Sequence, residues 1–188
     1  MENTKKTLFL NPEFLYLNFG LAELKTYILS VGLIAGSILF PYVLHHFYLA
    51  GEIFLPIYFF VLIGAYKFGW KVGVITGIFS PLASFALTGM PMLAILPSVI
   101  IKGILLAIVA GFFTRNYGKL SLLNLSLIVV SYQVAGFLIV YALTHNFALS
   151  VADLVLGYPG LIIEIIGGYV LLKFISGYGR KKLETNPK

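Results

Sequence analysis

The sequence has no cysteine among its 188 residues, and only 11% of the residues are charged. The absence of cysteine excludes disulfides, thiolate-ligated zinc, iron–sulfur centres and a thiol nucleophile. The scarcity of charge, together with a hydrophobic fraction of 60%, excludes an ordinary soluble domain, in which about 45–50% of residues are apolar. We therefore expect an all-α integral membrane protein, with residues 1–188 forming a single membrane domain built as one compact bundle.

Long apolar runs predict six transmembrane helices, since a helix needs about 20 mostly apolar residues to cross the bilayer. The runs cover Lys25–His45, Ile53–Tyr66, Lys71–Ser84, Met92–Phe113, Leu120–Thr144 and Asp153–Ile175. The second and third are short and could form one kinked span, but the charged, glycine-containing stretch KFGWK at 67–71 favours a turn between two helices. Around this bundle of residues 25–175, residues 1–24 form an interfacial segment, with a short helix start predicted at Asn11 and Pro12, and residues 176–188 a basic tail.

The basic residues are expected on one side of the membrane. With six spans and a cytoplasmic N-terminus, twelve of the thirteen Lys and Arg residues fall in inside segments, and the outer loops at 45–52, 87–92 and 144–153 contain none. This asymmetry follows the positive-inside rule and predicts that both termini are cytoplasmic. The same cations would meet anionic lipid headgroups, so the net charge of +6 does not indicate a nucleic-acid partner.

Three of the predicted helices each carry one strongly polar side chain, namely Lys102, Gln133 or Glu164. Each lies eleven residues from the outer end of its predicted helix, counted as 102 − 91, 144 − 133 and 164 − 153. At about 1.5 Å per residue this is roughly 16 Å, near the middle of the hydrocarbon core. A charge at that depth faces the bundle interior or a wet cavity, because contact with lipid costs several kcal/mol. Two interpretations stay open and are compatible: a structural Lys102–Glu164 ion pair with Gln133 bonded to a neighbouring helix, or the floor of a substrate cavity open to the outside.

Residues around these three favour a cavity. Phe137 and Tyr141 share the face of Gln133 toward the outer end of the helix, and glycines flank Glu164. Further candidate substrate contacts lie near the outer surface: His45, His46, Tyr48, Met90 and Tyr158. Plain helix packing explains the glycines at least as well, and interfacial solvation explains the histidines. No HExxH spacing and no serine paired with a histidine at matching depth is present, so we predict no catalytic residue, no metal ligand and no cofactor.

One region of the chain is similar to a known family of transporters. After an outer loop, it has a Leu-Pro entry into the second helix, a hairpin with Gly69, Gly73 and Gly77, and then the stretch SPLASFALTGMP. Together with GYPGLIIEIIGGYVLLK at 157–173, this resembles the substrate-binding S component of energy-coupling factor (ECF) transporters over about residues 25–175. The alternative is an intramembrane enzyme or a structural membrane subunit with a buried Lys–Glu pair.

The resemblance implies a non-catalytic subunit in the cell membrane of a prokaryote. Such a subunit captures a small water-soluble vitamin or vitamin precursor from outside and delivers it through a transmembrane coupling subunit with two ATPases. The chain has no Walker A sequence, so ATP hydrolysis is expected in the partner subunits. In the family, small residues on the first helix contact the coupling subunit. Gly32 and Gly36 hold that spacing here, with Ala35 beside them.

The family also places its substrate between the outer halves of helices four to six, under the first and third outer loops. This is the region of Lys102, Gln133 and Glu164. Metal-importing relatives carry an N-terminal Met-His segment, whereas this chain begins Met1-Glu2, so the resemblance points away from nickel and cobalt. A floor with both charges suits a zwitterionic or polar heterocyclic ligand, such as a B vitamin or a ribosylated benzimidazole.

The predicted topology can be tested with single cysteines, because the chain has none of its own. With both termini cytoplasmic, a membrane-impermeant thiol reagent added to intact cells should label Asn146→Cys but not Lys182→Cys. Permeabilised cells, in which both variants should react, provide the control. Labelling of Lys182→Cys in intact cells would reverse the assigned orientation.

Overall fold

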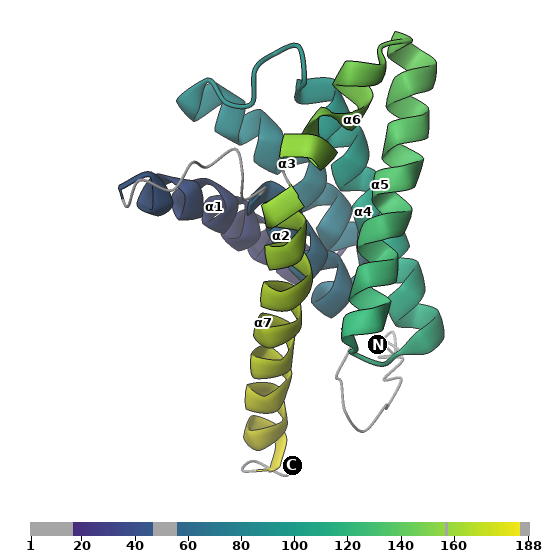
Figure 1. The fold of residues 1–188 in the computed structure, drawn as a ribbon. Helices are drawn as coiled ribbons and strands as arrows, with labels where there is room; N and C mark the ends of the chain where they lie inside the picture. Colours follow the sequence, from purple (N-terminus) through teal and green to yellow (C-terminus); the bar gives the residue numbers. More distant parts are fainter. Residues whose placement is uncertain (1–16, 47–55, 157, 185–188) are drawn as a thin grey trace.

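The computed structural model describes residues 17–46, 56–156 and 158–184, and all the regular structure in these ranges is helical. The elements follow one another as α1 (Leu24–His46), α2 (Pro56–Ile63), the π-helical turn η1 (Gly64–Phe68), α3 (Trp70–Thr88), α4 (Leu96–Tyr117), α5 (Leu122–Thr144), α6 (Phe147–Leu156) and α7 (Tyr158–Glu184) (Figure 1). Five of the described helices, α1, α3, α4, α5 and α7, are long and apolar enough to cross a membrane. The all-α fold is thus confirmed, and its long apolar helices are typical of a membrane protein.

Two of the six predicted spans are divided differently in the structure. Within the described residues, the span predicted at Ile53–Tyr66 consists of α2 and η1, which together are shorter than a full crossing. The span predicted at Asp153–Ile175 is replaced by two helices, because α6 occupies most of the segment predicted as an outer loop. The α5 helix ends at His145 in a left-handed conformation, with φ of 50°. A new helix then starts as the amide of Ser150 donates to the carbonyl of Asn146 at 3.1 Å.

The turn predicted at KFGWK is present. The π-helical turn η1 ends before Gly69, whose φ of 109° lies in the region that favours glycine, and α3 begins at the next residue. The two arms of the resulting hairpin pack closely, since a Cβ atom on Gly73 would lie 2.5 Å from the Cβ of Ala65. Leu17 and Phe19 bind the same turn by donating backbone hydrogen bonds to the carbonyls of Lys67 (2.9 Å) and Phe68 (3.3 Å).

The α4 helix is the centre of the bundle and packs against α2, α3 and α5. It meets α3 at a backbone-to-backbone contact, where a Cβ on Gly77 would lie 2.9 Å from the carbonyl carbon of Gly103. Six residues before its C-terminal end (117 − 111), Gly111 accommodates the side chain of Trp70, whose Cβ would lie 2.4 Å from an added Cβ. Small residues at such positions let helices approach closely enough for van der Waals packing to hold them together in lipid, where the hydrophobic effect between helices is absent.

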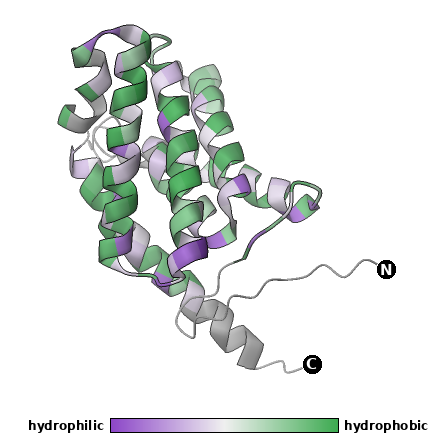
Figure 2. Cartoon of the chain, turned by 90° about the vertical axis from the view of Figure 1, so that its right-hand side faces the viewer, coloured by the Kyte–Doolittle hydropathy of each residue, from purple (hydrophilic) through white to green (hydrophobic). Residues whose placement is uncertain are grey.

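Apolar side chains also cover the outside of the bundle. Hydrophobic residues follow the helices along their length, whereas hydrophilic residues gather mostly at the helix ends and connecting loops (Figure 2). Large exposed apolar side chains occur on all five long helices, for example Val31, Phe79, Ile108, Leu138 and Val170. In Figure 1, α1 runs across the direction of α5 and α7. The end of the bundle that carries α6, at the top of Figure 1, is referred to below as the α6 end.

The contact between α3 and α4 generates a stability prediction. A methyl group at Gly77 would meet the backbone of Gly103, which cannot move aside as a flexible side chain could. We expect Gly77→Ala to lower the free energy of unfolding by about 1–3 kcal/mol, the usual cost of overpacking, and to lower the thermal midpoint in detergent accordingly. The matched control is Gly32→Ala on α1, where an added Cβ has nothing within 4 Å. This variant should be neutral or slightly stabilised, so equal midpoints for the two would contradict the close contact.

Candidate functional site

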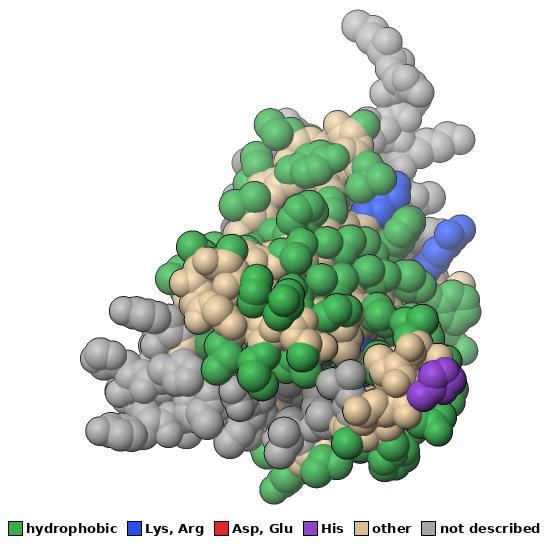
Figure 3. Space-filling model, turned by 90° about the horizontal axis from the view of Figure 1, so that it is seen from above, with side chains coloured by type: hydrophobic (Ala, Val, Ile, Leu, Met, Phe, Trp, Pro, Cys, Tyr) green, Lys and Arg blue, Asp and Glu red, His purple; other side chains and the backbone are tan. Residues whose placement is uncertain are grey.

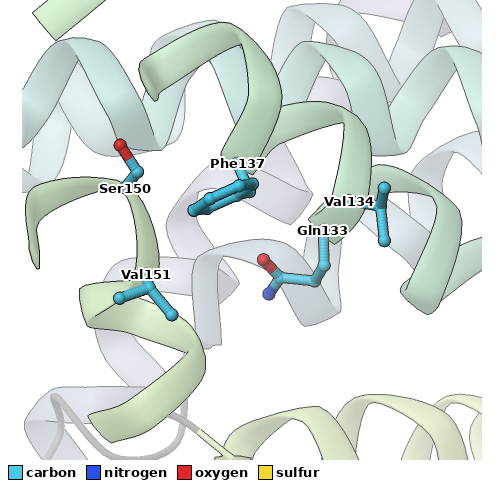
Figure 4. Close-up of a pocket in the computed structure, with 5 residues that line it drawn as sticks. All are labelled: Gln133, Val134, Phe137, Ser150 and Val151. Carbon is cyan, nitrogen blue, oxygen red and sulfur yellow. The ribbon is translucent and has the colours of Figure 1, made fainter. Parts of the chain in front are cut away.

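A cavity of about 150 Å³ lies between α5 and α6 (Figure 4). Its lining comes from three residues of α5 and two of α6: Gln133, Val134, Phe137, Ser150 and Val151. The surface of this described lining is almost wholly apolar, and Gln133 and Ser150 are the polar side chains among the five. Two of the predicted substrate contacts, Gln133 and Phe137, therefore meet at one cavity, while the contributions of α6 were not predicted.

The helical repeat of α5 brings Gln133 and Phe137 together. Residues four apart lie on the same face of a helix, so the phenyl ring stands directly above the amide, toward the α6 end. The ring stacks on Tyr141 with centroids 6.0 Å apart and meets Phe147 of α6 edge-on at 5.7 Å. Tyr141 is 43% exposed and supports Phe137 from outside the cavity. These aromatic contacts join α5 to α6 and hold one wall of the cavity.

Lys102 lies behind the cavity and is fully buried. Its aliphatic stem runs over Gly136 of α5, where an added Cβ would lie 2.6 Å from the lysine Cγ. Beyond this glycine, its Nζ donates to the backbone carbonyl of Ser150 at 3.3 Å. The lysine thus links α4 to α6 across α5. The ammonium group of Lys102 is thus bonded to Ser150, a residue of the lining, whereas Lys102 itself is not among the described lining residues.

Glu164 is also almost fully buried, with 1% of its surface exposed, and belongs to a short hydrogen-bond relay. The hydroxyl of Tyr132 donates to its Oε2 at 2.9 Å, and the Nε2 of Gln133 donates to the oxygen of Tyr132 at 3.2 Å. The ring of Tyr132 packs against that of Tyr58, with centroids 5.6 Å apart. The carboxylate therefore connects to the cavity through Tyr132 and Gln133, two consecutive residues of α5.

The predicted ion pair between Lys102 and Glu164 is not formed in the structure, in which Glu164 takes the hydroxyl of Tyr132 as its partner. Lys102 contacts α5 at Gly136 and Glu164 contacts it at Tyr132. Four residues separate these positions, or about 6 Å along a helix, so the two side chains meet α5 about one turn apart. The predicted spacing of eleven residues from the outer helix end holds for Gln133 at the end of α5 (144 − 133), whereas Lys102 and Glu164 lie six residues from the starts of α4 and α7 (102 − 96 and 164 − 158).

Other predicted contacts lie away from this cavity. Met90 is exposed in the connection between α3 and α4, and Tyr158 is exposed at the start of α7. Neither belongs to the lining. Tyr48 and the side chains of His45 and His46 lie outside the described part of the chain. Among the side chains that are described, no group of three His, Asp or Glu residues lies close enough to hold a metal ion.

Of the three residues predicted to form a partner surface on α1, two are exposed and one packs inside the chain. Gly32 and Ala35 are exposed, and the space beside Gly32 is open. Gly36, in contrast, is occupied within the chain, because the ring of Phe60 on α2 would lie 2.6 Å from an added Cβ. Gly36 therefore serves the packing of α1 on α2 and leaves Gly32 and Ala35 as the small residues available to a partner.

Tyr132 and Ser150 were missed by the sequence analysis. Tyr132 precedes Gln133 on α5, and its hydroxyl reaches Glu164 of α7. The available signal was its position next to Gln133 on the same helix, since neighbouring residues of a helix lie on adjacent faces. Ser150 was assigned to a loop, and the apolar run FALSVADLVL around it was the available signal for α6.

The two arrangements of Glu164 can be distinguished by double-mutant cycles. We expect Tyr132→Phe and Glu164→Gln to show a coupling energy of about 0.5–3 kcal/mol in the free energy of unfolding, because the two groups share a hydrogen bond. The cycle of Lys102→Met with Glu164→Gln should give a smaller coupling. The measurement is the unfolding free energy of each variant in the same detergent. A larger coupling for the lysine cycle would restore the ion pair predicted from the sequence.

Comparison of the chain with protein-family models, with curated proteins and with solved structures gave no match.

Proposed function

We propose that this protein is the substrate-capture subunit of an ECF-type importer, which binds a small vitamin-like molecule from outside the cell. The observation that carries the proposal is the cavity between α5 and α6, where Gln133 and Phe137 meet. The sequence resemblance locates substrate in this same region, between the outer halves of the later helices. A pocket with apolar walls and few oriented polar groups is the usual form of a small-molecule site.

The charge distribution supports an entrance from outside. The cavity lies toward the α6 end, and the segments at that end, 87–92 and 144–153, contain no Lys or Arg. Exposed cations occur at the other end of the same helices, with Arg115 in the last turns of α4 and Lys119 just before α5. Under the positive-inside rule, the α6 end faces outward and the cavity is reached from the external medium.

The α6 helix would serve as the outer wall of the binding site. It has only ten residues, and its described contacts with the bundle include the bond from Lys102 to the Ser150 carbonyl and the contact of Phe147 with Phe137. Lys102 is in this proposal a positioning residue, which holds the wall while the ligand contacts the residues in front of it. A fully buried ammonium is tolerated in the membrane because it has a carbonyl partner.

The exposed side of α1 supports the partner part of the proposal. Gly32 and Ala35 offer a flat surface between large apolar side chains such as Ile28 and Val31. The α1 helix packs against α2, η1 and α3, whereas the cavity lies between α5 and α6. A bulky residue at Gly32 would therefore obstruct a partner helix and leave the cavity unchanged.

The test combines binding, assembly and uptake. Purified protein is first screened by thermal shift against vitamins and their precursors, and the ligand found is then followed in cells. Uptake should require co-expression of the coupling subunit and both ATPases. Gly32→Leu should reduce both co-purification of the coupling subunit and uptake at least tenfold, as expected for about 1.4 kcal/mol of lost contact, with ligand affinity retained.

The control for this test is Val130→Leu, at an exposed position of α5. Gly36→Leu is unsuitable because Phe60 fills that position and the fold itself would suffer. Uptake that continues without the ATPases would contradict the importer function. If Gly32→Leu and Val130→Leu both co-purify with the coupling subunit as well as wild type does, the proposed interface on α1 would be contradicted.

A further inference from the structure

The hydrogen-bond relay behind the cavity determines which atom of Gln133 a ligand meets. The hydroxyl proton of Tyr132 is committed to Glu164, so the tyrosine oxygen has only lone pairs left. Those lone pairs accept from the Nε2 of Gln133, which fixes the amide nitrogen on the tyrosine side. The amide oxygen is left over. Gln133 is only 3% exposed, and its Oε1 has no hydrogen-bond partner among the described residues.

This unpartnered oxygen belongs to the wall of the cavity. Figure 4 shows the amide of Gln133 extending into the space between Phe137 and Val151, with its oxygen on the side of the phenyl ring. A buried carbonyl without a donor is costly, so a ligand that supplies one gains the hydrogen bond and removes the penalty together. A ligand without a donor leaves the penalty in place.

The other described residues of the lining supply no hydrogen-bond donor to the cavity. The hydroxyl of Ser150 donates to the carbonyl of Asn146 at 2.7 Å, and in Figure 4 its oxygen points away from Gln133. The ammonium of Lys102 is held at the carbonyl of Ser150, behind the lining. Val134, Phe137 and Val151 are apolar. The described lining therefore offers one oriented acceptor to the contents of the cavity and no group that would hold a carboxylate or a phosphate.

We infer that the cavity selects an uncharged, flat ring that carries an N–H or O–H group, which donates to the Oε1 of Gln133 while the ring packs on Phe137. This inference rests on the proposed function for its ligand-capture role and names the ligand class. Of the two ligand classes expected from the sequence, zwitterionic or polar heterocyclic, it favours the second, because neither Lys102 nor Glu164 is among the described residues that line the cavity. Tyr132 and Glu164 are positioning residues that keep the acceptor turned inward.

The size and surroundings of the cavity fit such a ring. An apolar protein cavity of about 150 Å³ is known to hold benzene, so a small aromatic ring system is the size of ligand that this cavity suits. The described surface seen from the α6 end is mostly hydrophobic, and no acidic side chain is visible on it (Figure 3). An uncharged ring can approach over this surface without the desolvation cost that an ion would incur.

The test uses two rings of the same shape, indole and benzofuran, which differ in the N–H donor. Their affinities for the full chain in lipid nanodiscs are measured by isothermal titration calorimetry, with empty nanodiscs as the blank for partition into lipid. We expect indole to bind about tenfold more tightly than benzofuran, as expected for one hydrogen bond to a buried acceptor. Benzoate, which has the ring but carries a charge that only accepts hydrogen bonds, should not bind.

Three variants test which residues produce the preference for indole over benzofuran. Gln133→Met removes the acceptor at similar length and should bring the indole-to-benzofuran ratio to about one. Tyr132→Phe keeps the ring and releases the amide, so the ratio should fall several-fold. Val151→Ala changes the apolar wall and should weaken both ligands with the ratio unchanged. Each ratio is taken within one protein preparation, so a variant that folds in lower yield still reports it.

The outcomes separate this inference from the importer role. Equal affinities for indole and benzofuran, a preference for benzoate, failure of any ring to bind, or a full ratio in Tyr132→Phe would each overturn the donor selectivity. None of these results bears on uptake that depends on the ATPases. Conversely, selectivity that follows Gln133 and Tyr132 in a chain that supports no such uptake would keep the binding site and remove the importer.

Discussion

The contact between Lys102 and Gly136 determines the arrangement of the polar groups in this bundle. The lysine stem occupies the space of the missing side chain at position 136, where an added Cβ would lie 2.6 Å from its Cγ. This path carries the ammonium past α5 to the Ser150 carbonyl and away from Glu164, which is bonded one turn lower. Any larger residue at 136 would displace the lysine, and with it the tether of α6. The bond from α4 to the α6 wall of the cavity, and the separation of Lys102 from Glu164, therefore depend on this contact.

The relay from Glu164 to Gln133 shows how a bundle in lipid handles polar side chains. Without water in the hydrocarbon region, each polar group must find a partner inside the protein. The Oε2 of Glu164, the hydroxyl of Tyr132 and the Nε2 of Gln133 are bonded to one another, whereas the Oε1 of Glu164 and the Oε1 of Gln133 have no hydrogen-bond partner among the described residues. A network in which every polar atom had a partner would contribute only to stability. An unpartnered acceptor beside a cavity can also accept a hydrogen bond from a molecule that enters the cavity. The polar network thus links Glu164 of α7 to the lining of the cavity.

The parts predicted correctly from the sequence are those that depend on local pattern. Apolar runs predicted the all-α fold and placed α1, α3, α4 and α5 within a few residues of their observed ends, and Gly69 marked the hairpin. The i, i+4 spacing placed Phe137 above Gln133. The ion pair failed because it depends on which partner each helix presents at each turn, and this is set by contacts between distant residues such as Lys102 with Gly136 and Gly36 with Phe60. The α6 helix was missed because a ten-residue apolar run is too short to read as a span.

The bundle joins its helices by two different kinds of contact. Between α3 and α4 the backbones themselves touch at Gly77 and Gly103, so that part cannot adjust without losing its packing. Between α5 and α6 the described contacts are made by side chains: the stacked ring of Phe137, the edge of Phe147 and the long arm of Lys102. Side chains change rotamer far more readily than packed backbones separate. The contact between α5 and α6 can therefore adjust more readily than the contact between α3 and α4, and Lys102 connects α6 to α4 through its bond to the Ser150 carbonyl.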